Sequence, residues 1–169
     1  DESEGENSSQ PPMFSPKEIT EHEEDAQISW SQLAKFPSGN AVPGQRRVKQ
    51  VWAIGGGKGG VGKSLLSSSL AISLAKQNLK TVAVDLDLGG ANLHTSLGVD
   101  LPSSTLSDFF AKRVDDLKEC LCQTSIPNLS IISGAQDAVG VANIRFSQKV
   151  ALLQKIRALD ADYVILDLG

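Results

Sequence analysis

Eight consecutive residues, 57–64, have the types and the spacing that bind phosphate groups. They read Gly-Lys-Gly-Gly-Val-Gly-Lys-Ser and fit the pattern G-x-x-x-x-G-K-[ST]. Glycines let backbone N–H groups face a phosphate with no side chain in the way, and a helix starting after the loop adds partial positive charge. Lys63 supplies a full charge, and Ser64 supplies a hydroxyl ligand for Mg²⁺. The pattern predicts nucleotide contacts along Gly57, Lys58, Gly59, Gly60, Val61, Gly62, Lys63, Ser64 and Leu65.

The residues on either side of this loop favour a functional site over a glycine-rich turn that matches by chance. Residues 48–54 alternate and predict a strand, and residues 65–77 predict a helix that is capped at its C-terminus by Asn78. Strand, loop and helix, in this order, are the context that the motif requires. The expected apolar face of the helix consists of Leu66, Leu70 and Leu74.

Three aspartates lie at the ends of two other predicted strands. Asp85 and Asp87 end the strand 80–86, and alternation turns both side chains toward the same face. Asp167 ends the strand 162–168. Ligands bind at the carboxyl ends of strands in open α/β sheets, where carboxylates can hold the waters of a magnesium ion and orient an attacking water. Two solvent-facing acids in a turn are the alternative for Asp85 and Asp87, and the phosphate loop disfavours it.

Strands and helices alternate from residue 47 to residue 169. Apolar runs such as 163–166 predict strands that are buried on both faces. The fold class is therefore α/β: a P-loop NTPase with a mostly parallel sheet and helices on both faces, in three layers. A doubly wound domain seldom ends on a central strand, so we expect the domain to continue beyond Gly169. The other predicted elements are helices at 105–112, opened by Ser103 or Ser104, and at 114–120, a strand at 129–133 and a helix at 147–159.

Residues 1–46 differ in composition from the domain at 47–169 and predict an acidic, largely disordered tail. Residues 1–25 hold nine Asp and Glu against one Lys, so the rest of a chain with net charge −4 is mildly basic. A short helix that starts at Ser15 is predicted within the tail. Apolar residues at near-helical spacing follow at 28–36 and could cover the domain or dock on a partner. The mild basic charge suits phosphate ligands and gives no reason to expect a nucleic-acid partner.

Cysteine usage and the lack of long apolar stretches predict a cytoplasmic protein. Cys120 and Cys122 are too close in sequence for an unstrained disulfide, and reduced thiols are favoured over a metal pair completed by a second chain. No apolar run approaches the length of a membrane span, and no signal peptide is visible. We interpret His22 and His94 as solvent-facing or packing residues.

Three segments together resemble one family. Residues 58–64 resemble the deviant Walker A motif, K-G-G-x-G-K-[ST], of the MinD/ParA-type ATPases. Residues 85–93, Asp-Leu-Asp-Leu-Gly-Gly-Ala-Asn-Leu, are similar to the switch I element of the MinD and FlhG (FleN) branch. Residues 167–169, Asp-Leu-Gly, resemble the start of switch II. The resemblance covers residues 49–169.

This resemblance implies a nucleotide shared between two subunits. Lys63 would bind the β- and γ-phosphates of ATP, and Ser64 would ligate Mg²⁺. Lys58 would reach the nucleotide of a second subunit, so that two chains enclose two ATP molecules. A lysine donated in this way does the work of an arginine finger, and it makes ATP a signal for dimerisation.

The acidic residues and one amide complete the implied site. Asp87 would position the hydrolytic water, which makes it catalytic together with the two lysines. Asp85 would support the magnesium shell, and Asp167 would hold a magnesium-bound water. Asn92 would belong to switch I, among the residues near the nucleotide and at the dimer or partner face.

The resemblance implies an ATP-hydrolysing switch that dimerises on ATP and regulates the placement or number of flagella or another polar structure. In the FlhG branch the partner is an FlhF-like GTPase, activated by an N-terminal Asp-Gln-Ala motif. The nearest sequence here, Asp25-Ala26-Gln27, does not match that motif. Two alternatives stay open: an Mrp-like iron–sulfur cluster carrier, which only the Cys-Leu-Cys pair favours, and a ParA-type DNA partition ATPase, whose switch I usually reads Pro-Gln-Gly. Peripheral association with the inner membrane is left open.

Overall fold

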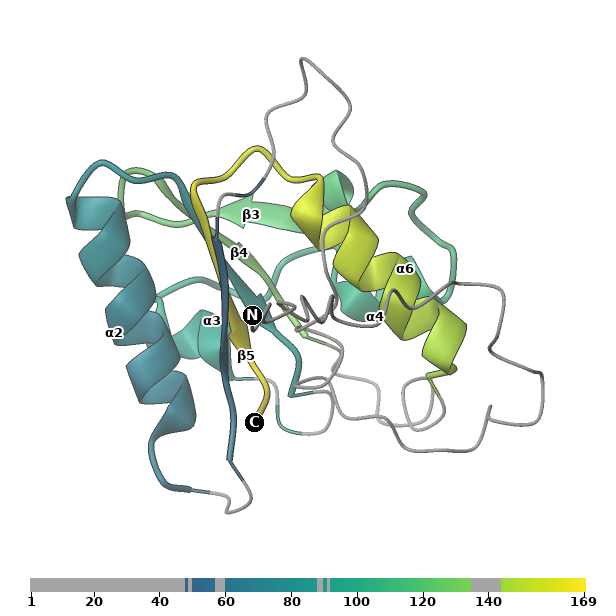
Figure 1. Ribbon diagram of the computed structural model, residues 1–169, viewed down its shortest axis with the longest axis horizontal. Helices are drawn as coiled ribbons and strands as arrows, with labels where there is room; N and C mark the ends of the chain where they lie inside the picture. Colours follow the sequence, from purple (N-terminus) through teal and green to yellow (C-terminus); the bar gives the residue numbers. More distant parts are fainter. Residues whose placement is uncertain (1–47, 49, 57–59, 88–89, 91, 135–143) are drawn as a thin grey trace, which may run out of the picture.

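A computed structural model describes residues 48, 50–56, 60–87, 90, 92–134 and 144–169, which form one sheet covered by helices on both faces (Figure 1). The five strands lie in the order β1-β5-β2-β4-β3. The first four are parallel, and β3 pairs antiparallel with β4 at one edge. In chain order the strands are β1 (Gln50–Ile54), β2 (Thr81–Asp85), β3 (Leu121–Gln123), β4 (Leu129–Ile132) and β5 (Tyr163–Asp167). The predicted α/β class and mostly parallel sheet are confirmed.

Helix α2 (Lys63–Lys76) covers one face of the sheet together with the short helix α3 (Leu93–Ser96). The apolar face predicted for α2 is wrong at its start, since Leu66 is 51% exposed. Most of the side chains that face the sheet are small, and small side chains let a helix lie close to the strands beneath it. The leucine spacing therefore identified the helix but not its packing face. The buried residues of α2 are Ser67, Ser68, Ala71, Leu74 and Ala75.

The turn after α2 explains how the chain enters β2. Asn78 has a φ of 61° and follows the cap residue Gln77, so it is the residue after the cap and not the cap that the sequence predicts. Its N–H donates to the carbonyl of Ala75 (3.0 Å), and the next N–H, of Leu79, donates to Leu74 (3.3 Å). This pair of bonds is the Schellman motif, which satisfies the last carbonyls of a helix.

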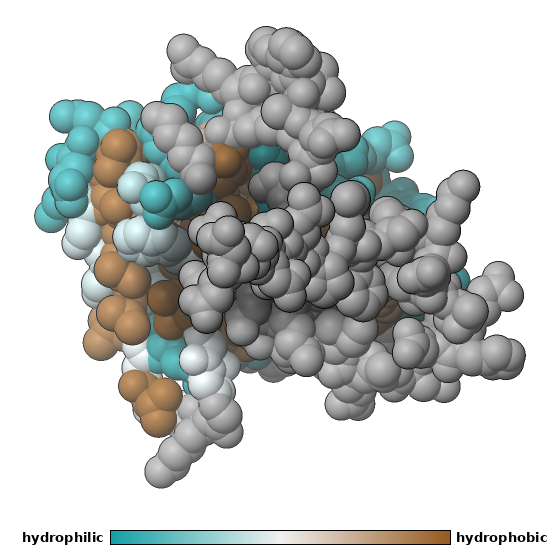
Figure 2. Space-filling model, viewed as in Figure 1, coloured by the Kyte–Doolittle hydropathy of each residue, from teal (hydrophilic) through white to brown (hydrophobic). Residues whose placement is uncertain are grey.

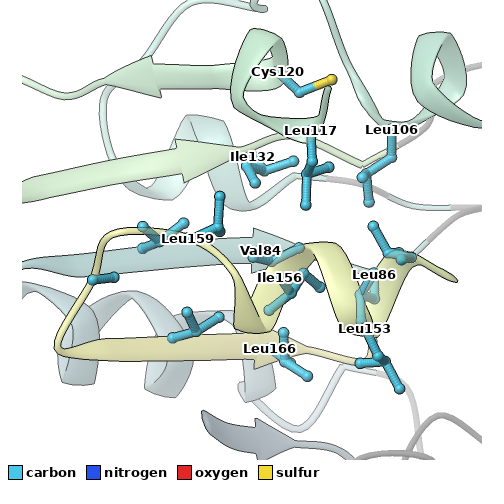
Figure 3. Packing of buried hydrophobic residues seen from close by; sticks show 14 residues of the cluster. Val84, Leu86, Leu106, Leu117, Cys120, Ile132, Leu153, Ile156, Leu159 and Leu166 are labelled. Carbon is cyan, nitrogen blue, oxygen red and sulfur yellow. The ribbon is translucent and has the colours of Figure 1, made fainter. Parts of the chain in front are cut away.

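Helices α4 (Leu106–Phe110) and α6 (Phe146–Arg157) cover the opposite face, with a 3₁₀ turn, η2 (Leu117–Cys120), beside them. Their apolar side chains meet those of β2, β4 and β5 in the larger core cluster (Figure 3). The helix predicted at 114–120 is thus shorter and of the 3₁₀ type. The members of the larger core cluster include Val84, Leu86, Leu106, Leu117, Ile132, Leu153, Ile156 and Leu166.

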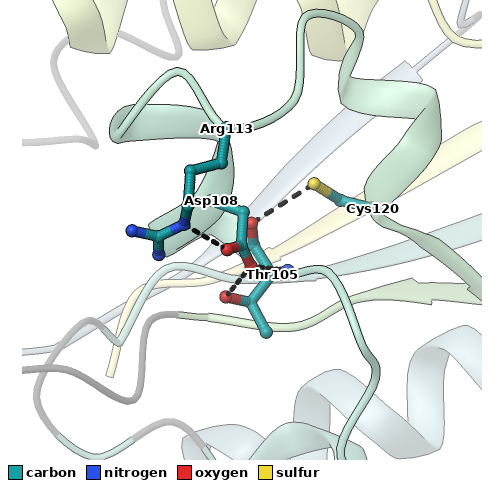
Figure 4. A network of polar contacts seen from close by, with 4 residues as sticks. All are labelled: Thr105, Asp108, Arg113 and Cys120. Carbon is teal, nitrogen blue, oxygen red and sulfur yellow. Dashed lines mark hydrogen bonds and ion pairs between the residues drawn. The ribbon is translucent and has the colours of Figure 1, made fainter.

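A small polar network fixes the start of α4 (Figure 4). Thr105 is the cap residue, in place of the expected Ser103 or Ser104, and its N–H donates to Asp108 Oδ2 (2.8 Å). Arg113 Nε donates to Asp108 Oδ1 (2.7 Å). The bond from Thr105 and the contact with Arg113 lower the pKa of Asp108 below its ordinary value. The Cys120 thiol donates to the Thr105 carbonyl (3.2 Å), and burial raises its pKa to about 11.

Two elements have no counterpart in the sequence prediction, namely β3 and α3. Both are only three or four residues long, which is too short for a hydrophobic period to be visible. The predicted tail helix at Ser15 and the apolar segment 28–36 lie outside the described residues. No helix in the described part of the chain combines the length and the apolar character needed to cross a bilayer.

Candidate functional site

The carboxyl ends of β1, β5 and β2 meet at one edge of the sheet, and α2 begins there (Figure 1). Asp167 is in register with Ile54 of β1 and with Asp85 of β2. Pairing continues past the strands, because the N–H of Leu168 donates to the Ile54 carbonyl (2.9 Å) and that of Leu86 to the Asp167 carbonyl (2.8 Å). The backbone therefore holds the two aspartates side by side at a fixed level.

Both aspartates point toward the face that α2 covers. Ala83 and Ile165, two residues earlier on the same strands, belong to the core cluster that contains α2, and side chains two residues apart share a face. Asp85 is fully buried, and Asp167 is 1% exposed. Asp85 and Asp167 thus end β2 and β5, close to where the sequence predicts these strands to end, and the structure adds that the two acids are neighbours.

The two carboxylates differ in their partners. Asp85 accepts two backbone N–H bonds, from Asp87 to Oδ1 (3.1 Å) and from Leu93 to Oδ2 (3.0 Å). Burial raises the pKa of Asp85 to about 6; the two N–H bonds oppose this rise, and the charges of Asp167 and Asp87 add to it. Both oxygens of Asp167 are buried and have no hydrogen-bond partner among the described residues.

A magnesium ion fits the chemistry at Asp167. A buried carboxylate without partners is costly, and a bound cation removes that cost. The described residues hold no group of three or more His, Cys, Asp or Glu that could bind a metal unaided. Mg²⁺ needs no such group, because it keeps several waters and shares the oxygens of substrate phosphates with one or two carboxylates.

The start of α2 suits an anion. Gly60 and Gly62, with φ of 74° and 89°, turn the backbone into the helix through conformations that favour glycine. No side chain caps the helix, and its first turn contains no acidic residue. A Cβ on Gly56 would lie 3.7 Å from Lys63 Cδ, so the lysine side chain reaches back to the residues that follow β1. An uncapped helix start beside a lysine is a favourable place for a phosphate.

The segment after β2 is bonded within itself. The Gly90 N–H donates to Asp87 Oδ1 (3.2 Å), and Asn92 Nδ2 donates to the Gly90 carbonyl (2.8 Å). Sequence reasoning missed the bond between Asp85 and the Leu93 N–H, since a backbone donor leaves no mark in the residue pattern. Asn92 itself is exposed, and its predicted contact with the nucleotide stays a prediction.

The remaining predicted contacts lie partly outside the described residues. Gly57, Lys58 and Gly59 are among those not described, so the role of Lys58 stays a prediction. Val61 and Leu65 are 59% and 69% exposed. Figure 2 shows hydrophobic side chains that reach the surface along α2, and the exposed large hydrophobic residues of this helix are Leu65 and Leu66. Ser64 is the second residue of α2, half-buried near the aspartates' edge of the sheet.

Comparison with known proteins agrees with this geometry. A family model described as an AAA domain matches residues 49–169. The septum site-determining protein MinD of Helicobacter pylori is 36% identical over 118 residues, which are 69% of this chain and 43% of that protein. The flagellum site-determining protein YlxH of the same organism is 42% identical over 82 residues, which are 48% of this chain and 27% of that protein. The iron–sulfur cluster carrier protein of Escherichia coli is 31% identical over 126 residues, which are 75% of this chain and 33% of that protein.

Two solved structures of MinD proteins share the fold. The cell division ATPase MinD of Pyrococcus furiosus superposes with a TM-score of 0.61 at 31% identity, covering 71% of this chain and 50% of that one. The Pyrococcus horikoshii MinD, complexed with Mg-ADP, gives 0.59 at 30% identity, covering 70% and 48%. The chain thus spans about half of these structures, and less of the curated relatives.

Proposed function

This chain belongs to the MinD/ParA-type P-loop ATPases, and from that premise we propose that it binds ATP with Mg²⁺, dimerises on ATP and hydrolyses it as a molecular switch. One observation carries the proposal. Two complementary features lie at the same edge of the sheet. The uncapped start of α2, with Lys63, favours an anion. The buried Asp167, whose oxygens have no partner among the described residues, favours a cation. MgATP supplies both charges.

Each residue at this edge has a task in the proposed hydrolysis. The N–H groups at the start of α2 and the Lys63 ammonium hold the β- and γ-phosphates. Ser64 and Asp167 would hold the metal, directly or through water, and Mg²⁺ there would supply positive charge against the phosphates. Asp87 orients the water that attacks in line.

Dimerisation supplies what one chain lacks. Lys58, the lysine of the K-G-G-x-G-K-S sequence, neutralises transition-state charge at the nucleotide of the second chain. Because this group arrives only with the partner, turnover requires the dimer, and hydrolysis releases it. The ATP-bound dimer is then the active state of the switch.

For the process that the switch controls, we propose the placement or number of flagella or another polar structure. The resemblance of residues 85–93 to the MinD and FlhG switch I supports it, as does the similarity to a protein named for flagellum site determination. An FlhF-like GTPase is the corresponding partner. The proposed location is the cytoplasm, where the dimer could also meet the inner membrane surface.

Iron–sulfur cluster transfer is the second candidate, since one relative is a carrier of this kind. The two cysteines described here do not favour it. Cys120 packs in the core cluster under α4 and α6, whereas Cys122 packs against the cluster under α2, so the pair faces opposite sides of the sheet. Anaerobically purified protein that is colourless would argue against a cluster, and visible absorbance would support one.

Light scattering with no nucleotide, ADP and ATP tests the switch. We expect the mass of the full chain to double only with ATP. The Lys58→Ala variant should bind ATP yet stay monomeric and lose turnover. Lys76→Ala, which removes an exposed lysine from the last turn of the same helix, serves as the control and should dimerise normally. An unchanged mass in all three states, or normal turnover in Lys58→Ala, would refute the proposed mechanism.

A further inference from the structure

Asp85 uses both of its carboxylate oxygens to hold backbone N–H groups. Oδ1 accepts from Asp87, two residues on, and Oδ2 accepts from Leu93, eight residues on. The carboxylate is fully buried. Bonds from N–H groups to an ionised carboxylate are roughly twice as strong as neutral ones, so a buried carboxylate with two of them holds its donors firmly.

These two donors bracket the segment between β2 and α3. At one end, the Asp87 N–H fixes the backbone from which the Asp87 side chain projects. At the other end, Leu93 is fully buried in the core cluster beside α2 and opens α3. The bonds of Gly90 with Asp87 and Asn92 lie inside the bracketed stretch. One carboxylate therefore ties the start of this segment to its anchored end.

Asp167 is the natural comparison for Asp85, because it is the same residue type in a similar position but has different partners. It is in register with Asp85, is as deeply buried, and points toward the same face. Yet neither of its oxygens has a protein partner among the described residues. Of two neighbouring carboxylates, one is committed to backbone donors and the other is available to a cation.

We propose that Asp85 is a positioning residue: its carboxylate clamps the backbone at Asp87 and Leu93 and so aims the Asp87 side chain at the attacking water, while Asp167 serves the metal. The aiming half of this inference rests on the proposed role of Asp87. The clamp itself does not, because both hydrogen bonds join groups of this chain alone.

Amide hydrogen exchange tests the clamp in the full chain without nucleotide or Mg²⁺. We expect slow exchange of the Asp87 and Leu93 amides in the unaltered protein. In Asp85→Asn at least one of them should exchange at least about 10-fold faster, because an amide side chain has one acceptor oxygen and its NH₂ group cannot accept. Asp167→Asn is the control and should leave both rates unchanged. Fast exchange of both amides in the unaltered protein, a measurement that needs no variant, would overturn the clamp.

A double-mutant cycle with Asp87→Asn tests the aiming. Alone, Asp85→Asn should lower kcat about 10- to 100-fold, with the Kd for ATP and the Mg²⁺ concentration for half-maximal turnover nearly unchanged. In the Asp87→Asn background it should cost little more, since there is no carboxylate left to aim. A raised Mg²⁺ requirement, or a full additional loss in that background, would instead make Asp85 part of the metal shell. The exchange experiment gives the same answer whether or not the protein hydrolyses ATP, so a failed clamp and a failed proposed function are distinguishable.

Discussion

Gly169 lies directly against Asp87. A Cβ on Gly169 would stand 2.6 Å from Asp87 Cγ, and the glycine has a φ of 75°. The segment that follows β5 thus contacts the residue proposed to orient the water, which lies in the segment that follows β2. Because the two segments touch, a backbone shift at the end of one strand would displace the segment after the other. Two elements that both respond to one bound phosphate are expected to be linked in this way.

Replacing Gly169 by alanine should damage both stability and turnover. The added Cβ overlaps the Asp87 carboxylate and pays the cost of a left-handed backbone, so we expect a loss of about 1–3 kcal/mol in unfolding free energy and a lower kcat. Gly98→Ala is the matched control: its φ is 66°, but nothing lies within 4 Å of the added Cβ. It should lose only about 1 kcal/mol and keep its kcat. Equal effects of the two substitutions, measured by urea unfolding and ATPase assay, would show that the contact with Asp87 is unimportant.

Asp167→Asn should maintain or raise the stability of the protein without Mg²⁺ but remove the stabilisation by MgATP. Without Mg²⁺ the substitution removes a buried charge whose oxygens have no described partner, so the variant should match the unaltered protein or exceed it by about 1–2 kcal/mol. With MgATP the unaltered protein should gain stability and the variant should not. Thermal unfolding with EDTA and with MgATP measures both. Asp160→Asn, at an exposed aspartate paired with Lys80, is the control for a change of charge.

The sequence predicts the parts of this fold in which residue type dictates geometry. Alternation and apolar runs located β2 and β5, and the glycine pattern located the start of α2. The packing face of α2 was misjudged, because leucines at helical spacing suggested it while small residues such as Ala71 and Ala75 form it. The Asp85–Leu93 bond was out of reach, because any residue supplies a backbone N–H and only the folded chain brings that donor to the carboxylate.

The cap of α4 should respond to acid in a defined direction. The pKa of Asp108 is lowered in the folded protein, by the Thr105 N–H first and by Arg113 second, so its contribution is present above the ordinary value of 3.8 and is lost as the pH falls through the folded pKa. Asp108→Asn should therefore cost about 1 kcal/mol at pH 7, and the difference from the unaltered protein should close below about pH 4. Urea midpoints across this pH range measure it. A difference in stability between Asp108→Asn and the unaltered protein that stays constant with pH would contradict this role of Asp108. Asp100→Asn, at an exposed aspartate, is the control and should match the unaltered protein at every pH.

The two cysteines should differ in reactivity. Cys120 is buried and its pKa is raised to about 11, so little thiolate forms and access is poor. Cys122 is half-buried on the edge strand β3. We expect iodoacetamide at pH 8 to label Cys122 at least about 10-fold faster than Cys120, as read by peptide mass spectrometry, and the difference to vanish in guanidinium. Equal labelling of the native protein would show that the Cys120 environment opens freely.

Titration calorimetry of the full chain with ATP and Mg²⁺ tests the central claim most directly. That claim is that the start of α2, the Lys63 ammonium and the Asp167 carboxylate together hold a magnesium-bound triphosphate. It predicts saturable binding of about one ATP per chain, weakened about 10- to 100-fold in Lys63→Ala, because one charge-assisted contact is lost. Absence of binding in the unaltered protein, or equal affinity in Lys63→Ala, would contradict the claim.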